Sequence, residues 1–189
     1  MQHKTRYTAW LIAAHVLALP GGAQGAQTCD TTITPTSPDS RFNAALRDGT
    51  VIDKITGLTW KKCSEGQTYN VDANTCSGNA VPYTWPKALQ RAREVNQGGA
   101  GKTGGYAGYT DWRVPNIKEL RSLVEQACRD PAINPHKTIF PLSPSALYWS
   151  SSPFARTVGE AWGVDFTSGE ATFESMANPG FVRLVRGGL

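Results

Sequence analysis

Few side chains in this sequence could carry out catalysis, because histidine is scarce. The chain has three histidines, and only His136 follows the first 25 residues. A catalytic zinc ion needs several nitrogen or sulfur ligands, and a Ser-His-Asp triad would depend on the same histidine without a G-x-S-x-G motif. The serines at 150–152 have no base near them in the sequence. We therefore interpret His136 as a loop residue and predict no catalytic residue and no metal ligand.

Carboxylates are the remaining route to catalysis. Glycoside hydrolases use two Asp or Glu residues with no fixed spacing in the sequence, and the chain has 15 acidic residues. An enzyme that acts on glycan or cell-envelope material through such a pair is therefore the alternative function. Asp72 and Asn74 resemble two positions of a calcium loop, but the glycine and the terminal glutamate are absent. We expect no cofactor. The sequence does not exclude a calcium ion with a structural role.

The four cysteines are better explained as disulfides. An even number of cysteines in an exported chain favours disulfide bonds, and the C-x-x-C spacing of redox and zinc motifs is absent. Four cysteines allow three pairings. We favour Cys63–Cys76, which would close a short polar loop, and Cys29–Cys128, which would tie the N-terminal segment to the rest of the chain.

Residues 1–25 have the features of a secretory signal peptide. Lys4 and Arg6 precede a mostly apolar stretch at 8–19, which is too short to span a bilayer, and cleavage is expected before Ala26. Without these 25 residues the count of Lys and Arg falls from 19 to 17, against 15 acidic residues. No basic run is long enough to suggest a nucleic-acid partner, and no later stretch could span a membrane. We expect an exported protein that is periplasmic, cell-surface or extracellular.

For the mature chain the sequence predicts a short extended segment at 26–40 and one α+β domain at 41–189. Pro35 and Pro38 disfavour a helix in the extended segment. In the domain, Asn116 and Glu119 form a capping-box pattern at the start of a helix. The expected elements are a hairpin at 50–61, a loop at 64–83, helices at 85–96 and 117–128, and strands at 147–151, 161–166, 171–175 and 181–186.

Five segments of the domain carry a resemblance to a known family. They are TGLTW at 56–60, GYTDWRVPNIKEL at 108–120, YWSSSP at 148–153, AWGVDF at 161–166 and FVRLVRGG at 181–188. In order and spacing they resemble the Lcl C-terminal domain family over roughly residues 41–188. The resemblance implies a single C-type-lectin-like domain with two helices packed on a mostly antiparallel sheet, long loops and disulfide bonds.

The resemblance also implies a non-enzymatic recognition domain. One relative is the tip of a collagen-like adhesin that binds sulfated glycosaminoglycans, and others are variable target proteins of diversity-generating retroelements. Glu160, Glu170, Glu174 and Met176 cannot arise from the adenine-specific randomisation of such systems, so we favour a fixed surface. The EPN and QPD triplets of sugar-binding C-type lectins are absent, which argues against calcium-dependent sugar binding.

The expected function is adhesin-like binding of a glycan or protein through the loops of residues 148–180. A structural subunit of a surface assembly is a further alternative function. The sequence does not determine whether the protein forms an oligomer. The ligand-binding candidates are Trp149, Phe154, Arg156, Asp165, Thr167, Glu170, Thr172 and Glu174. If the ligand is a sulfated glycan, the basic alternative is Lys87, Arg91, Arg93 and Lys102. The residues expected to be structural are Trp60, Trp112 and Trp162 in the core, Arg113 paired with Glu119 or a carbonyl, and Arg183 and Arg186.

Overall fold

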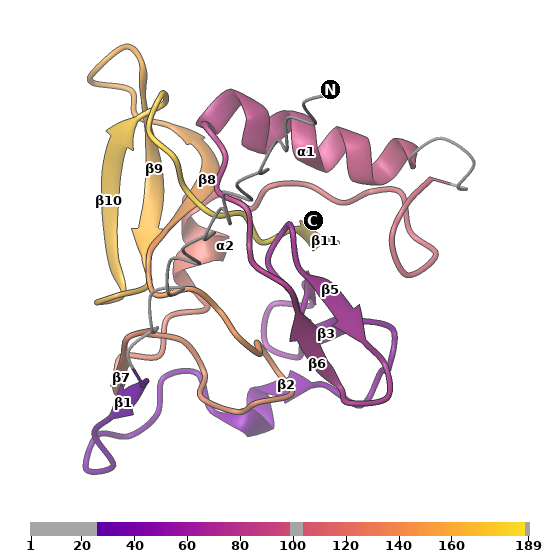
Figure 1. Ribbon diagram of the computed structural model, residues 1–189. Helices are drawn as coiled ribbons and strands as arrows, with labels where there is room; N and C mark the ends of the chain where they lie inside the picture. Colours follow the sequence, from indigo (N-terminus) through magenta and orange to yellow (C-terminus); the bar gives the residue numbers. More distant parts are fainter. Residues whose placement is uncertain (1–25, 99–103, 188–189) are drawn as a thin grey trace, which may run out of the picture.

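The computed structural model describes residues 26–98 and 104–187 and shows an α+β fold stapled by two disulfides (Figure 1). The expected signal peptide and Lys102 lie outside the described residues. The predicted fold class is confirmed: two α-helices pack on antiparallel sheets. Cys29 pairs with Cys128 and Cys63 with Cys76, as the sequence suggested.

A four-stranded sheet, called the central sheet because both ends of the 41–187 region pair in it, has the strand order β11-β4-β3-β2. Its strands are β2 (Phe42–Asn43), β3 (Thr50–Asp53), β4 (Thr59–Lys61) and β11 (Val185–Arg186). The predicted hairpin is β3 and β4, and Gly57 in its turn has the positive φ of 70° that glycine adopts without strain. The C-terminal strand is shorter than predicted, because only residues 185–186 pair with β4.

The segment at 64–83, predicted to be a loop, contains a second hairpin. Strands β5 (Thr68–Asn70) and β6 (Thr75–Ser77) pair around a turn in which Asn74 is left-handed, with φ 49°. The strands are short and mostly polar, so they lack the apolar alternation that identifies a strand from sequence. The Cys63–Cys76 disulfide attaches β6 to the chain just after β4, which stabilises a hairpin too small to be stable alone.

The three-stranded sheet lies beside the central sheet and is an antiparallel meander in the order β10-β9-β8 (Figure 1). It consists of β8 (Leu147–Pro153), β9 (Glu160–Asp165) and β10 (Glu170–Ser175), close to the predicted strands. The pairing of β8 with β9 shifts register between Trp149 and Pro153, which marks a bulge. Every predicted ligand-binding candidate lies in this sheet or its two turns.

The helices differ in how well the sequence predicted them. Helix α1 (Trp85–Gln97) matches, although the side chain of Thr84 makes no capping hydrogen bond. Helix α2 (Ile117–Arg121) begins at the predicted capping box but ends seven residues before the predicted end at Cys128. It stops because the chain turns to bury Leu123 and Val124, while Glu125 accepts hydrogen bonds from the backbone N–H groups of Thr36 and Ser37.

The N-terminal segment, predicted to be extended, contains a short strand and several turns and is held against the domain. Its strand β1 (Thr28–Cys29) pairs with β7 (Cys128–Arg129), and the 3-10 turn η1 (Asp39–Arg41) leads into β2. The disulfide between Cys29 and Cys128 crosses the paired strands. The segment is therefore part of the folded unit.

The interior has two apolar clusters, one on each side of the three-stranded sheet. The first contains Trp60, Leu120 and Val164, and the second contains Trp112, Trp149 and Ala161. Trp60 and Trp112 are buried, as expected of core residues. Within residues 26–98 and 104–187, neither helix has the length and apolar character needed to cross a bilayer.

Candidate functional site on the three-stranded sheet

The register of the three-stranded sheet brings aromatic residues from all three strands or their ends onto one face. Phe173 on β10 lies directly opposite Trp162 on β9. Phe154, just after β8, donates its backbone N–H to the carbonyl oxygen of Glu160, so it lies beside the start of β9. Because side chains of a strand alternate between its faces, Glu160 and Trp162 share one face of β9.

The three rings form a compact cluster, here called the aromatic trio (Phe154, Trp162 and Phe173). The two phenyl rings are stacked, with centroids 4.1 Å apart and an interplanar angle of 1°. The indole of Trp162 is perpendicular to both, at 5.1 Å from Phe154 and 5.7 Å from Phe173. Stacked and edge-to-face pairs of this kind hold rings in a defined arrangement, so the trio is a preorganised surface feature.

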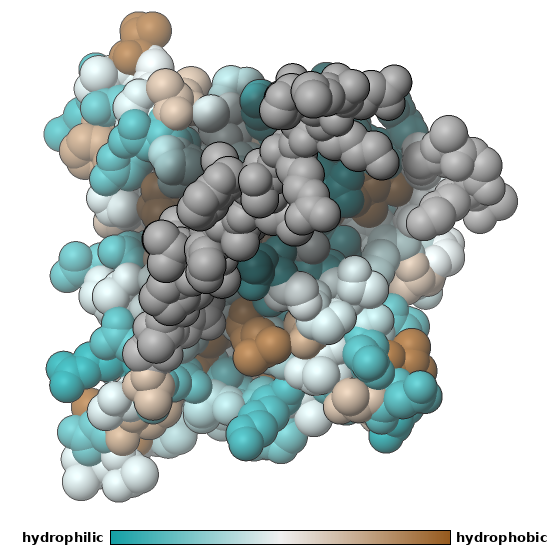
Figure 2. Space-filling model, in the orientation of Figure 1, coloured by the Kyte–Doolittle hydropathy of each residue, from teal (hydrophilic) through white to brown (hydrophobic). Residues whose placement is uncertain are grey.

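The aromatic trio lies at the surface. Phe173 is 44% exposed, whereas Phe154 and Trp162 are partly buried. Trp162 was expected in the core, and this expectation is wrong: its strand neighbours Ala161 and Val164 are buried instead. Val158 in the β8–β9 turn is fully exposed, and Figure 2 shows hydrophobic surface at the tip of this turn, at the top of the view.

Exposed aromatic rings that touch each other are unusual on a soluble domain. Single exposed apolar residues need no explanation, but a contiguous apolar patch commonly marks a binding surface. Phe154 was among the predicted ligand-binding residues, whereas Phe173 and Glu160 were not. The sequence contained a signal for these aromatic residues. Trp162 and Phe173 are each a large aromatic residue in a predicted strand whose other residues are largely small or polar.

Trp149 was predicted to face a ligand, and the structure shows that it does not. Its side chain is fully buried, and its indole Nε1–H donates to the carbonyl oxygen of Tyr83 at 2.9 Å. Strand β8 has core on both faces at this point, so Tyr148, Trp149 and Ser150 are all buried and alternation does not identify an outward residue.

The other predicted ligand residues do not form one surface. Asp165 shapes the β9–β10 turn, where its Oδ1 accepts from the N–H of Thr167 at 2.8 Å. Thr172 and Glu174 alternate with Phe173 and so lie on the opposite face of β10. The exposed members at the two turns are Arg156 beside the trio, and Thr167 and Glu170 at the far end of the sheet.

The basic alternative on α1 is partly neutralised. Arg91 donates through Nε to the buried carboxylate of Glu65 at 2.9 Å and also contacts Glu94. Lys61 binds the other oxygen of Glu65 at 2.5 Å. Lys87 and Arg93 are exposed. The described part of this cluster therefore offers a weaker site for a polyanion than the residue types suggested.

The residues predicted to be structural make the contacts that such a role needs. Arg113 binds Glu119 through two hydrogen bonds of 2.7 and 2.8 Å, as expected. Arg186 binds Asp111 at 2.8 Å and stacks on Tyr109, and the Arg186 hydrogen bond lowers the pKa of that aspartate. Arg183 is buried, and burial lowers its pKa.

Arg183 holds the chain that follows β4 against the loop that precedes β8. Its guanidinium donates to the carbonyl oxygens of Lys61 and Lys62 and to the hydroxyls of Ser64 and Ser143. The same group stacks on the ring of Phe140, with 4.8 Å to the centroid. Because the buried guanidinium is bound by all these partners, we assign Arg183 a structural role.

Three acidic residues, Asp53, Glu65 and Glu125, are buried as whole residues, and each is bound by partners in the protein. Asp53 binds Arg41 through contacts of 2.9 and 2.5 Å, and Glu65 binds Lys61 and Arg91. Glu125 accepts from backbone N–H groups and the hydroxyl of Thr36. In the part of the chain that the structure describes, no group of three His, Cys, Asp or Glu residues could hold a metal ion.

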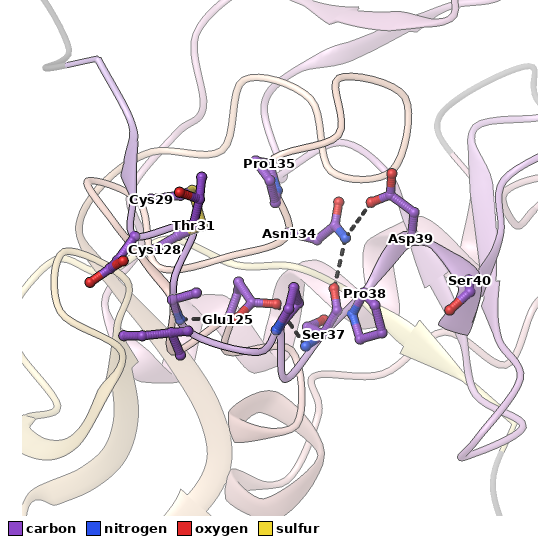
Figure 3. A pocket seen from close by; sticks show the side chains of 14 residues that line it. Cys29, Thr31, Ser37, Pro38, Asp39, Ser40, Glu125, Cys128, Asn134 and Pro135 are labelled. Carbon is purple, nitrogen blue, oxygen red and sulfur yellow. Dashed lines mark hydrogen bonds between the residues drawn. A yellow bond between two sulfur atoms is a disulfide. The ribbon is translucent and has the colours of Figure 1, made fainter.

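A cavity of about 560 Å³ lies between the N-terminal segment and the loops that follow α2 (Figure 3). The Cys29–Cys128 disulfide, Pro38 and Pro135 contribute to its walls. Asn134 donates to the carbonyl oxygen of Ser37 and to Asp39, as the dashed lines in Figure 3 show. Since the polar groups of Asn134 and Glu125 are used to hold the N-terminal segment, we assign this region a structural role.

The comparisons with known proteins agree with the segments singled out in the sequence. The family model of the Lcl C-terminal domain matches residues 49–186, which is more than half of the chain. No individually curated protein matches the chain. The matched range contains the three-stranded sheet, strands β3, β4 and β11 of the four-stranded sheet, both helices and the aromatic trio. The chain therefore belongs to the Lcl C-terminal domain family.

Proposed function

We propose that this protein is an exported, non-enzymatic recognition domain that binds a glycan or protein ligand on the three-stranded sheet. The aromatic trio of Phe154, Trp162 and Phe173 is the observation that carries the proposal. The trio lies within the region 148–180 that the family resemblance assigned to ligand binding. An adhesin-like role and a C-type-lectin-like ancestry belong to the same proposal.

Export is supported by the covalent structure. The two disulfides, Cys29–Cys128 and Cys63–Cys76, use every cysteine of the chain. Structural disulfides persist in oxidising compartments and are rare in the cytosol. Membership of the Lcl C-terminal domain family is in keeping with an extracellular domain.

Recognition is better supported than catalysis. Aromatic residues are enriched among those that dominate binding energy at interfaces. A carboxylate that acts as a general acid or base must reach a substrate, whereas Asp53, Glu65 and Glu125 are buried and bound by protein groups. The glycan-acting enzyme considered from the sequence therefore receives no support from these three carboxylates.

The proposal can be tested with a double variant, Phe154→Ser with Phe173→Ser. Purified residues 26–189 are applied to an array of glycans and cell-surface protein ectodomains, with calcium and with chelator. We expect wild-type protein to bind a subset of spots, and the double variant to lose about tenfold or more in affinity, because truncating a central aromatic typically costs at least 2 kcal/mol.

The matched control is Ile55→Ser, since Ile55 is 75% exposed in the β3–β4 turn, away from the trio. This variant should bind as the wild type does. Binding that survives the double variant in a folded protein would show that the ligand uses another surface. A wild-type protein that binds no spot at micromolar concentration would contradict the recognition role.

A further inference from the structure

We infer that the aromatic trio, together with Glu160, is a subsite for a neutral sugar ring. This inference rests on the proposed recognition function and assigns a chemical class to its ligand. Two polar groups stand beside the rings and have no partner among the described residues: the carboxylate of Glu160 and the indole N–H of Trp162.

Glu160 is unusual among the carboxylates near the interior of the domain. Among the described residues, its buried Oε2 has no hydrogen-bond partner. Asp53, Glu65 and Glu125, by contrast, are fully bound. A buried acceptor without a donor destabilises the free protein. A ligand that donates a hydrogen bond to this carboxylate removes that penalty, and it displaces little bound water because the group is only partly solvated.

Trp162 supplies the complementary group. Among the described residues its indole Nε1–H donates to no acceptor, whereas the same groups of Trp85, Trp112 and Trp149 each donate to a carbonyl oxygen. Trp162 follows Glu160 by two residues in β9, so both side chains are on the face that carries the trio. One free donor and one free acceptor therefore flank the rings.

A sugar ring matches this combination of groups. Each hydroxyl both donates and accepts a hydrogen bond, so one sugar can donate to Glu160 and accept from Trp162. The apolar C–H face of the ring can pack on the exposed ring of Phe173. A lysine or another cation would also suit the carboxylate and the rings, but it has no acceptor for the indole N–H.

The charge beside the trio indicates a neutral sugar. Of the carboxylates in β9 and β10, Glu160 shares the face of Trp162 and Phe173, whereas Asp165, Glu170 and Glu174 alternate to the opposite face. A sulfate or carboxylate group placed next to Glu160 would be repelled by its carboxylate. The surface therefore differs in kind from a site for glycosaminoglycans.

The test uses residues 26–189 and three sets of immobilised probes: neutral oligosaccharides, sulfated glycosaminoglycans and polylysine. We expect binding to a subset of the neutral probes, with little dependence on salt. The Trp162 indole resonance, identified by its absence in Trp162→Phe, should shift in the ¹H–¹⁵N spectrum when the bound neutral sugar is added.

Two conservative variants test the polar groups. Trp162→Phe keeps an aromatic ring and removes the N–H, and Glu160→Gln keeps an acceptor and removes the charge. Each should weaken binding of the neutral sugar about three- to tenfold, in line with one lost or weakened hydrogen bond. Lys54→Gln, a change in the exposed β3–β4 turn, is the control and should leave the affinity within about twofold. Thermal unfolding of each variant checks that the fold is intact.

The outcomes separate this inference from the proposed function. Salt-sensitive binding to sulfated probes alone, or binding to polylysine alone, would overturn the neutral-sugar inference. If such binding is still lost in the Phe154→Ser and Phe173→Ser variant, the proposed recognition face stands. Neutral-sugar binding that neither Trp162→Phe nor Glu160→Gln weakens would also overturn the inference. Failure of the wild-type protein to bind any probe or ectodomain would contradict both the recognition function and the neutral-sugar inference.

Discussion

At the scale of single residues, the domain stabilises buried charges by direct pairing. Arg41 and Asp53 are both buried and joined by two hydrogen bonds. Burial alone would raise the pKa of Asp53, but hydrogen bonds from Arg41, Thr56 and the N–H of Ile55 outweigh it, so the pKa lies below the ordinary value of 3.8. Removing one partner of such a pair is costly because the other charge stays buried.

The depressed pKa of Asp53 predicts a loss of stability in acid. The unfolded chain binds a proton at this group first as the pH falls, so the contribution is present above about pH 4 and is lost as the pH falls through the lower pKa of the folded state. Glu119 acts in the same direction: hydrogen bonds from Arg113 and the N–H of Asn116 lower its pKa, against the effect of burial.

We expect Asp53→Asn to lower the free energy of unfolding at pH 7 by about 3 kcal/mol and to reduce its dependence on pH below about pH 4. Urea unfolding between pH 7 and pH 3 measures both quantities. A variant with the same slope as wild-type protein would show that other carboxylates cause the acid sensitivity.

At the scale of elements, the stability of the short helix α2 depends on the hydrogen bonds at its N-terminal end. Helix α2 has only five residues and begins with a complete capping box: the side chain of Asn116 accepts from the N–H of Glu119 at 2.9 Å, and Glu119 accepts from the N–H of Asn116 at 2.8 Å. Arg113 holds the same carboxylate. The helix therefore connects the DWRVP segment to the three-stranded sheet, where the N–H of Ile117 donates to Ser152.

Replacing the cap should destabilise the domain measurably. We expect Asn116→Ala to cost about 1 kcal/mol, the usual effect of losing an N-cap side chain. Lys118→Ala is the control at the next exposed position of the helix and should change stability by about 0.5 kcal/mol or less. Denaturant unfolding of the two variants makes the comparison, and equal effects would mean that the capping box adds no stability here.

At the scale of the whole molecule, the two disulfides constrain very different lengths of chain. Cys29 and Cys128 are 99 residues apart and join the N-terminal segment to β7, whereas Cys63 and Cys76 are 13 residues apart. In the chain-entropy model a longer loop gives more stabilisation, because the crosslink removes more freedom from the unfolded chain. The segment at 26–40 is thus tied to the fold by the stronger of the two constraints.

Serine variants should reveal this difference. We expect Cys29→Ser with Cys128→Ser to lose about 4–5 kcal/mol and Cys63→Ser with Cys76→Ser about 3 kcal/mol of stability. Urea midpoints at one pH provide the measurement. Ligand binding at the aromatic trio should persist in the first variant wherever it is folded, because the rings of the trio pack on one another and this disulfide joins β1 to β7. A larger loss from the short loop would contradict the entropic explanation.

The sequence by itself determined the family segments, the presence of disulfides, the β3–β4 hairpin, α1 and the three strands of the three-stranded sheet. These features depend on local signals: periodicity, turn residues, cysteine parity and a capping box. Tertiary structure alone decided that α2 stops after Arg121 and that a polar hairpin forms at β5–β6. It also decided that Trp149 is buried while Trp162 is at the surface. Side-chain alternation predicts two faces of a strand, but which face is covered depends on segments distant in the sequence that pack against it.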